Sequence, residues 1–188
     1  MATSNDFEGL LDHNVDHLGE FQYVEPATAQ GGNRGYDLVF YTKTEYEVTS
    51  VVTNGLRFQD VTALLPEELI CTLHSGQEGI ARHIVDVTAG LVIANGRGIE
   101  YDSILTNSNP LVAGTNISGI IGYPSPYFGP DFDLFRDSTG RAVLQTITLI
   151  PVTREEAEFA GDNSVDELWD IWREKKANIL DINRLSAL

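Results

Sequence analysis

The longest hydrophobic pattern in the chain is a run of apolar and β-branched residues at 143–152, interrupted by a single glutamine. A run of this kind, without polar alternation, is typical of a strand that is buried on both faces, and we expect it to be a central strand. Thr153 and Glu156 follow at the spacing of a capping box, in which each side chain binds a free backbone amide of the first helical turn. A short helix should therefore begin where this strand ends.

A second helix is predicted after the break at residues 161–163. Ser164 and Glu167 again have the spacing of a capping box, and the helical pattern continues to about Asn178. The apolar residues on this helix recur every three or four positions and form one face, which should dock on the sheet. They are Val165, Leu168, Trp169 and Trp172.

The rest of the chain combines one more long helix with several strands. Apolar residues recur at helical spacing from Gln77 to about Asn95, where glycines end the pattern. Segments that read as strands lie at 36–44, 46–53, 69–73, 103–105, 111–112, 117–123 and 132–136. Hairpin turns are expected around 43–45 and at 137–140. These elements predict an α+β fold, in which a mixed, mostly antiparallel β-sheet is packed by two principal α-helices.

The length of 188 residues suits one domain, and a single cysteine leaves no internal disulfide. We expect a flexible N-terminal segment at 1–14 and a single domain at 15–188. Residues 1–19 lack a basic start followed by an apolar core, and the apolar stretches are far shorter than the roughly 20 residues that a membrane helix requires. The sequence therefore predicts a cytoplasmic protein that does not associate with membranes.

The charge balance bears on the kind of partner. The chain carries 28 acidic and 12 basic residues, a formal net charge of −16. Nucleic-acid binding draws much of its affinity from the neutralisation of phosphates by Lys and Arg, so DNA and RNA are poor candidates. Such a charge would steer the chain toward a basic protein. The alternative is that the acidic surface only keeps the protein soluble.

Few residues have the spacing of a metal or cofactor site. His13 and His17 lie four positions apart and would share a helix face, but no further ligands complete a metal site, which favours a solvated or capping pair. Residues 31–35 lack the Gly-Lys-Ser/Thr ending of a phosphate-binding loop. Asp131, Asp133 and Asp137 do not have the spacing of a calcium loop, so a turn is expected there. We predict neither metal nor cofactor.

Nor does the sequence contain a catalytic set at the spacing of a known motif. Cys71 lies in an apolar run, where burial would keep its thiol unreactive. His74 and His83 have no Ser, Cys or Asp partner at the spacing of a known motif. The sequence therefore predicts a protein that is not an enzyme.

The composition changes to Gly, Asn, Ser, Pro and Tyr at residues 99–130. Long loops of this kind are often functional, and the aromatic residues at 123–128 stand on a backbone stiffened by prolines, which suits protein contacts. The alternative is simple packing of the loop over the core. The candidate partner-binding residues are Tyr123, Tyr127, Phe128, Asp131 and Asp133.

Several short motifs resemble a known family. They are Leu149-Ile150-Pro151, the Thr-x-x-Glu-x-x-Phe pattern of 153–159, the acidic Leu-Trp segment 166–169 and the terminal segment 181–186, together with 52–56 and 66–70 upstream. Over roughly residues 15–188 the chain resembles the suppressor of fused (SUFU) domain family, and in particular its bacterial single-domain members.

This resemblance implies a function in protein–protein association. Animal members of the family hold a transcription factor through added strand pairing, and bacterial members are associated with toxin-immunity loci. The expectation is thus a non-enzymatic protein-binding module, either a toxin-neutralising immunity protein with a basic toxin domain as its partner or a regulatory binder. A self-associating structural subunit and an enzyme with an unrecognised site are the alternatives, and the sequence does not define an oligomeric state.

Overall fold

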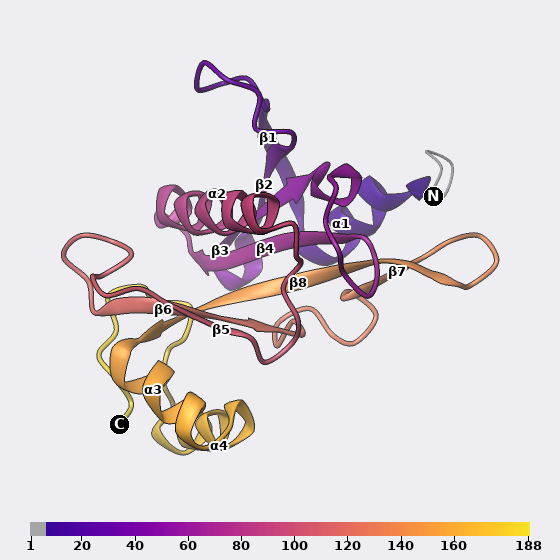
Figure 1. Cartoon of the computed structure of the whole chain (residues 1–188). Coiled ribbons are helices and arrows are strands. Elements are labelled where there is room, and N and C mark those ends of the chain that lie inside the picture. The colour runs from indigo at the N-terminus through magenta and orange to yellow at the C-terminus, as the bar shows by residue number, and fades with distance from the viewer. Residues whose placement is uncertain (1–6) are drawn as a thin grey trace.

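Eight strands form one mixed sheet in the computed structural model, which describes residues 7–188 (Figure 1). Their order across the sheet is β1-β2-β3-β4-β8-β6-β5, and β7 pairs with β8 beside this path. The strands are β1 (Glu20–Glu25), β2 (Asp37–Lys43), β3 (Val48–Asn54), β4 (Glu67–His74), β5 (Ile104–Thr106), β6 (Ile117–Tyr123), β7 (Leu134–Arg136) and β8 (Ala142–Thr153). The pairing of β4 with β8 is parallel and the other pairings are antiparallel, which confirms the predicted mixed, mostly antiparallel sheet.

β8 is the central strand that the run at 143–152 predicted. It pairs with β4 through residues 145–148, and on its other side with β7 and then with β6. All of its side chains except the first are buried, because helices and loops cover both faces of the sheet. The predicted hairpins between β2 and β3 and between β7 and β8 are also confirmed.

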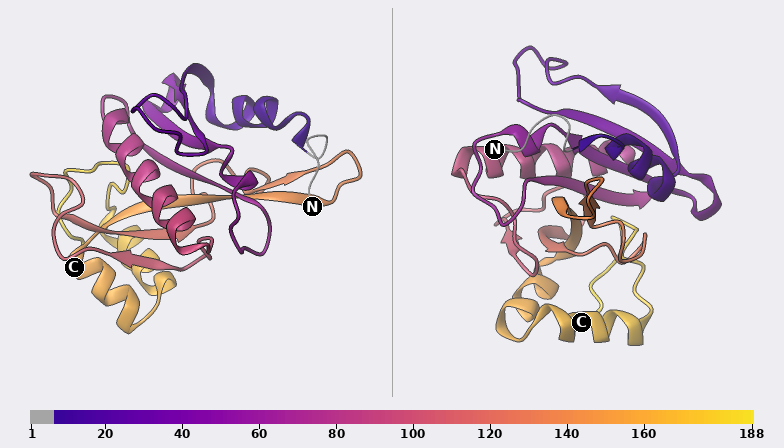
Figure 2. Two further views of the ribbon diagram at one scale, coloured as in Figure 1. Left: turned by 45° about the horizontal axis from the view of Figure 1, so that its top comes forward. Right: turned by 90° about the vertical axis from the view of Figure 1, so that its right-hand side faces the viewer.

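The helices cover the two faces of the sheet separately. α2 (Glu78–Asn95) packs on the face that presents Leu69 and Cys71, whereas α3 (Arg154–Asp162) and α4 (Val165–Lys175) pack on the opposite face, over Ile150 and Val152. Figures 1 and 2 show α2 on one side of β8 and α3 with α4 on the other. The packing of the sheet by the two predicted principal helices is therefore confirmed.

The helix starts follow from local side-chain chemistry. The Thr153 hydroxyl accepts from the amide of Glu156 at 3.3 Å, and the Glu156 carboxylate accepts from the amide of Thr153 at 3.0 Å, which is the predicted capping box. Ser164 accepts from the amide of Glu167 at the start of α4. α4 ends at Lys175, before the predicted Asn178, because Lys176 takes a left-handed conformation with φ of 52°.

The chain after α4 is irregular but anchored. Arg184 donates from Nη1 to Glu156 Oε1 at 2.5 Å and from Nη2 to Glu156 Oε2 at 2.7 Å, and the pair is almost fully buried. Burial alone would raise the pKa of Glu156, but the Arg184 guanidinium holds this pKa below its ordinary value. The C-terminal segment therefore closes over the face that carries α3 and α4.

Residues 111–112 were expected to form a strand, but they lie in the loop before β6, where the Leu111 amide donates to the Ile117 carbonyl. The boundary expected at residue 14 falls inside α1 (Leu10–Leu18), and Leu10 packs against Phe135 and Leu144. Residues 1–6 lie outside the described residues, and the flexibility of 1–14 stays a prediction. Among residues 7–188, none of the helices combines the length and the apolar composition required to cross a bilayer.

Candidate protein-interaction surface

β1 is one of the two edge strands of the sheet, and every side chain in it except the last is exposed. A bulge between Phe21 and Tyr23 changes the register with β2. The Phe21 ring packs edge-on against Tyr41 with centroids 6.3 Å apart, whereas the Tyr23 ring stacks on Phe40 at 4.2 Å. Neighbouring residues of a strand point to opposite faces, so the bulge places one exposed aromatic side chain on each face of the edge.

Two exposed residues of β1 lie on the face that carries α1. Phe21 pairs with Tyr41 and Val24 pairs with Val39 across the β1–β2 ladder, and paired residues share a face. Tyr41 and Val39 belong to one buried cluster with Leu18 of α1. The C-terminal end of α1 lies over β2, and Phe21 and Val24 on the neighbouring strand β1 stay about half exposed.

The two histidines of α1 face away from β1. A ring nitrogen of His13 lies 3.0 Å from the Phe132 carbonyl oxygen, and one of His17 lies 3.3 Å from that of Phe128. Phe132 is clustered with Ile70 of β4, so the 128–132 segment lies on the side of α1 opposite to β1. Burial lowers the pKa of His13. Within residues 7–188, no group of three or more metal-ligating side chains is brought together, and these histidines contact the loop.

The opposite flank of α1 is apolar and exposed. At about 100° per residue, Leu11 and Val15 lie nearly opposite the histidine flank around the helix, on the β1 side. Leu11, Val15, Phe21 and Val24 are 58%, 43%, 52% and 41% exposed. We call these four residues the α1–β1 surface. These exposed apolar side chains come from two consecutive elements, which makes them a candidate protein contact site.

The α1–β1 surface is bordered by carboxylates. Asp12 and Asp16 lie one turn apart on the solvent side of α1, and Glu20 begins β1 on the opposite face of the sheet from Phe21, since it pairs with Thr42. All three are exposed, and within residues 7–188 none of them forms an ion pair with a Lys, Arg or His side chain. Their negative charge is therefore available to a partner.

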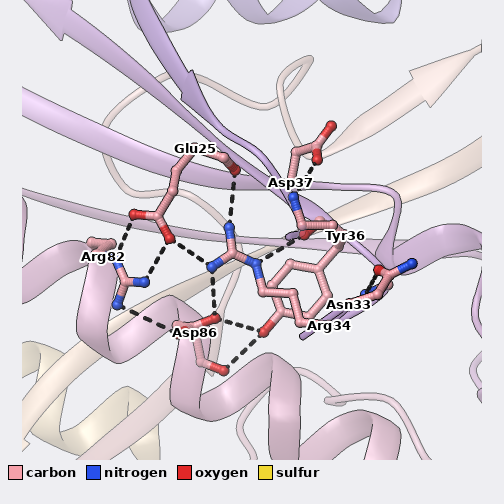
Figure 3. Close-up of polar contacts among 9 residues, drawn as sticks. Glu25, Asn33, Arg34, Tyr36, Asp37, Arg82 and Asp86 are labelled. Atoms are coloured by element: carbon pink, nitrogen blue, oxygen red, sulfur yellow. Dashed lines mark hydrogen bonds and ion pairs between the residues drawn. The ribbon is translucent and has the colours of Figure 1, made fainter. Parts of the chain in front are cut away.

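A cluster of charged residues holds the far end of β1 (Figure 3). Glu25 pairs with Arg34 at 2.7 Å and with Arg82 of α2 at 2.6 Å. Asp86 lies within 3.5 Å of both guanidinium groups and accepts a hydrogen bond from the Tyr36 hydroxyl at 2.9 Å. Strand β1, the loop 26–36 and α2 are thus joined through one network.

The charges within the network balance one another. The Arg82 and Arg34 guanidinium groups lower the pKa of Glu25 from 4.5 to about 2, so this carboxylate is ionised at neutral pH. Burial, together with the bond to Asp86, raises the pKa of Tyr36. The two cations balance the two carboxylates, which indicates a structural role. Arg34 comes from the GGNRG segment, and its guanidinium is engaged by Glu25 and Asp86.

The residues predicted to bind a partner lie at separate places. Tyr123 packs on Trp169 of α4 with centroids 5.1 Å apart. Tyr127 and Phe128 line a pocket of about 160 Å³ beside the turn that joins β2 to β3, together with Lys43 and Tyr46. Their part in binding stays a prediction, since no partner is present to test it.

The two predicted aspartates also differ from each other. Asp131 is exposed, whereas Asp133 is buried and accepts a hydrogen bond from the Ser125 amide at 2.7 Å. Burial raises the pKa of Asp133 from 3.8 to about 6. Asp133 therefore fixes the loop from within, and only Asp131 presents its carboxylate to solvent.

No residue of the α1–β1 surface was identified from the sequence. The segment Glu20–Glu25 alternates charged or polar with aromatic residues, which was the available signal for an edge strand. The cysteine prediction agrees with the structure, because Cys71 is buried and burial raises the pKa of its thiol. A hollow of about 870 Å³ is lined by residues 62–64, 96–97, 100–101 and Gln145, and this lining contains no histidine or cysteine.

The comparisons with known proteins agree with one another. The family model described as Suppressor of fused protein (SUFU) matches residues 32–185. The crystal structure of a putative SUFU homolog from Neisseria gonorrhoeae is 18% identical with a TM-score of 0.72, and the match covers 99% of this chain and 98% of that one. The Sufu–Fu complex structure is 11% identical with a TM-score of 0.68, covering 99% and 93%.

The crystal structure of Drosophila Suppressor of Fused is 11% identical with a TM-score of 0.68, and the match covers 97% of this chain and 51% of that one. This chain therefore spans about half of the Drosophila protein. At these identities the likeness to solved structures shows the fold alone. No curated protein matches the sequence.

Proposed function

The chain belongs to the suppressor of fused family, whose model matches residues 32–185, and from this we propose that it is a non-catalytic protein-binding domain for a basic protein partner. One similar structure is that of a complex between Sufu and Fu, so a fold of this kind is compatible with holding another protein. The proposal for this chain depends on its own surface.

The observation that carries the proposal is the exposed edge strand β1. An unpaired strand edge offers backbone donors and acceptors to another chain, and proteins usually blunt such edges unless they are used. β1 carries Phe21 and Tyr23 about half exposed, one on each face. Aromatic side chains are enriched in the energetically dominant positions of protein interfaces.

The charge of the chain supports a basic partner. A net charge of −16 gives a long-range attraction that accelerates encounter with a cationic protein and weakens as salt screens it. Asp12, Asp16 and Glu20 place part of this charge beside the exposed edge. The attraction and the apolar contact area therefore lie in the same region.

A more specific form of this proposal is a toxin-neutralising immunity protein. An acidic domain that covers a basic toxin would combine fast association with steric blocking. The test is coexpression with the product of the adjacent reading frame. We expect this product to be a large secreted protein with a variable C-terminal toxin region, whose toxicity the chain suppresses. A partner from a metabolic operon would contradict this form while leaving protein binding intact.

The general proposal is tested by affinity capture with matched variants. Phe21→Ala and Tyr23→Ala remove the aromatic side chains of β1, and Phe58→Ala and Tyr46→Ala remove comparably exposed aromatics elsewhere. We expect one basic protein to copurify in stoichiometric amount with the wild-type chain and the two controls, and to be lost with the β1 variants. No stoichiometric partner at any salt concentration, or equal loss in all four variants, would contradict the proposal.

Self-association is the second candidate, because a free edge can also pair with a second copy. The carboxylates beside β1 argue against it, since two copies would place like charges together. Sedimentation of the purified chain distinguishes the two: a monomer is expected, and a dimer that Tyr23→Ala dissociates would favour the structural-subunit alternative.

A further inference from the structure

We propose that the α1–β1 surface binds a basic amphipathic helix of the partner, with its apolar side chains against Leu11, Val15, Phe21 and Val24 and its Lys or Arg side chains on the neighbouring carboxylates. This inference rests on the proposed function and adds the position of the contact and the chemistry of the bound segment. Figure 2 shows α1 and β1 at the same edge of the molecule.

The geometry of the surface suits one helix. Gly19 alone separates α1 from β1. Its φ is 91°, and a Cβ at this position would lie 2.6 Å from the Thr42 carbonyl oxygen. Only glycine therefore fits at this turn. The apolar pair on α1 spans about 6 Å and the pair on β1 about 10 Å, from the rise per residue of each element. This matches the apolar stripe of a helix of about two to three turns.

The position of the surface within the fold explains why it is exposed. α1 packs on β2 at its C-terminal end and on β7 and β8 through Leu10, and we use the word step for the change in level between this helix and the exposed residues of β1. Within the described residues, no other segment covers Leu11, Val15, Phe21 or Val24. A bound helix placed in the step would contact both elements and bury apolar area from each.

The charges select a cationic occupant. Asp12 and Asp16 lie one helical turn apart on α1, beside Leu11 and Val15 along the border of the step. Lys or Arg side chains at matching spacing on a bound helix would reach these carboxylates while its apolar stripe stays in the step. Lys43, a cation near the end of α1, is engaged with the His17 carbonyl on the other flank. A second copy of this chain, or an acidic helix, would meet like charge.

The first test uses designed peptides as probes. A fluorescently labelled helical peptide with Leu on one face and Lys on the other is titrated with the chain, and the same peptide with Glu in place of every Lys serves as the ligand control. The matched variants are Leu11→Ser with Val15→Ser on α1, and Val87→Ser with Leu91→Ser, an exposed Val–Leu pair at the same spacing on α2.

We expect the Leu–Lys peptide to bind, the Leu–Glu peptide not to bind, and the α1 variant to weaken the affinity at least about tenfold while the α2 variant leaves it unchanged. Because the substituted residues are exposed, the melting temperatures of both variants should equal that of the wild type. Equal binding by the two variants, or by the two peptides, would overturn the inference, because it would show only general attraction to an acidic protein.

The second test addresses the carboxylates. Asp12→Asn with Asp16→Asn removes the pair on α1, and Asp166→Asn with Asp170→Asn removes an exposed pair of the same spacing that also begins in the first turn of its helix. We expect the Asp12/Asp16 substitutions to weaken binding of the Leu–Lys peptide several-fold more than the Asp166/Asp170 substitutions at low salt. This difference should shrink as the salt concentration is raised. Equal effects of the two variants would overturn the inference.

These results separate the two proposals. If the captured protein partner depends on Phe21 and Tyr23 but is unaffected by the substitutions at Leu11 and Val15, the protein-binding function stands and the α1–β1 surface is not where the partner docks. If the basic peptide depends on Leu11 and Val15 but no protein partner is captured, the surface chemistry stands and the proposed function fails.

Discussion

Glu25 Oε1 lies 2.6 Å from Nη2 of Arg82, which ties the last residue of the edge strand β1 to α2. An edge strand is hydrogen-bonded on one side only, and a strand that had to become ordered on binding would bind less tightly. The bond to Arg82 and the second bond of Glu25 to Arg34 hold β1 in place before any partner arrives. The exposed aromatics of β1 are thus presented on a fixed strand.

Glu25→Gln should destabilise the fold by about 2 kcal/mol at neutral pH, because it leaves Arg34 and Arg82 with Asp86 as their remaining carboxylate partner. Chemical denaturation at pH 7 measures the change. Glu20→Gln at the other end of β1 is the control, because Glu20 is exposed, and it should stay within about 0.5 kcal/mol of the wild type. Equal effects of the two substitutions would contradict the assigned role of the cluster.

The same pair predicts a pH dependence with a definite sign. The pKa of Glu25 is lowered from 4.5 to about 2, so its contribution to stability is present above pH 4.5 and is lost as the pH falls through this window. Unfolding curves from pH 5 to pH 2 should show a slope that Glu25→Gln reduces. An unchanged slope would mean that the ion pairs contribute little.

Asp133 should have the opposite pH dependence. Its pKa is raised from 3.8 to about 6, so the folded state binds the proton more tightly, and the stabilisation by protonation is lost as the pH rises through 6. Asp133→Asn retains an oxygen for the Ser125 amide and should increase stability at pH 7 by about 1 to 3 kcal/mol, with the gain vanishing below pH 4. The neighbouring substitution Asp131→Asn, at an exposed position, should show no such gain. A loss of stability in Asp133→Asn at pH 7 would contradict the argument.

The C-terminal anchor gives a third comparison. Arg184→Met leaves the Glu156 carboxylate buried without its cation, and removal of one partner of a buried pair costs about 3 to 5 kcal/mol. Arg173→Met breaks an exposed pair with Asp170 and should cost under about 1 kcal/mol. Thermal unfolding of both variants tests the difference, and similar melting temperatures would show that the C-terminal segment contributes little to the fold.

Two glycines should respond to alanine in opposite directions. A Cβ on Gly122 of β6 would lie 2.5 Å from Ile99 Cγ2, so Gly122→Ala should destabilise the fold by about 1 to 3 kcal/mol. Gly90 lies in α2 with open space around it, and Gly90→Ala should stabilise by up to about 1 kcal/mol, because alanine favours the helix. Denaturation midpoints that shift in the same direction would contradict this packing.

The elements predicted correctly are those whose signal is local. The apolar run of β8 and the capping box at Thr153 are each complete within a few residues, so the sequence sufficed for both. α4 ended earlier than its pattern suggested, because the left-handed turn at Lys176 has no glycine or asparagine to mark it. Local patterns thus defined the core of the fold but not every boundary.

The candidate site could not be predicted in the same way. β1 exposes both of its faces, and its alternation of polar and aromatic residues runs only from Glu20 to Tyr23 before Val24 interrupts it, which is the lower limit of a strand signal. Glu25 and Arg82 are separated by 57 positions and meet only through the packing of α2 on the sheet. Asp131 and Asp133 look equivalent in sequence, yet only Asp133 turns inward to the Ser125 amide.

Hydrogen exchange of the chain, alone and with its copurified basic partner, tests the central claim most directly. The outward amides of β1 should exchange rapidly in the free protein, because an edge strand leaves them unpaired. We expect the partner to slow exchange in residues 10–25 and to leave the 124–133 loop unchanged. Protection confined to that loop, or absent from β1 and α1, would contradict the account.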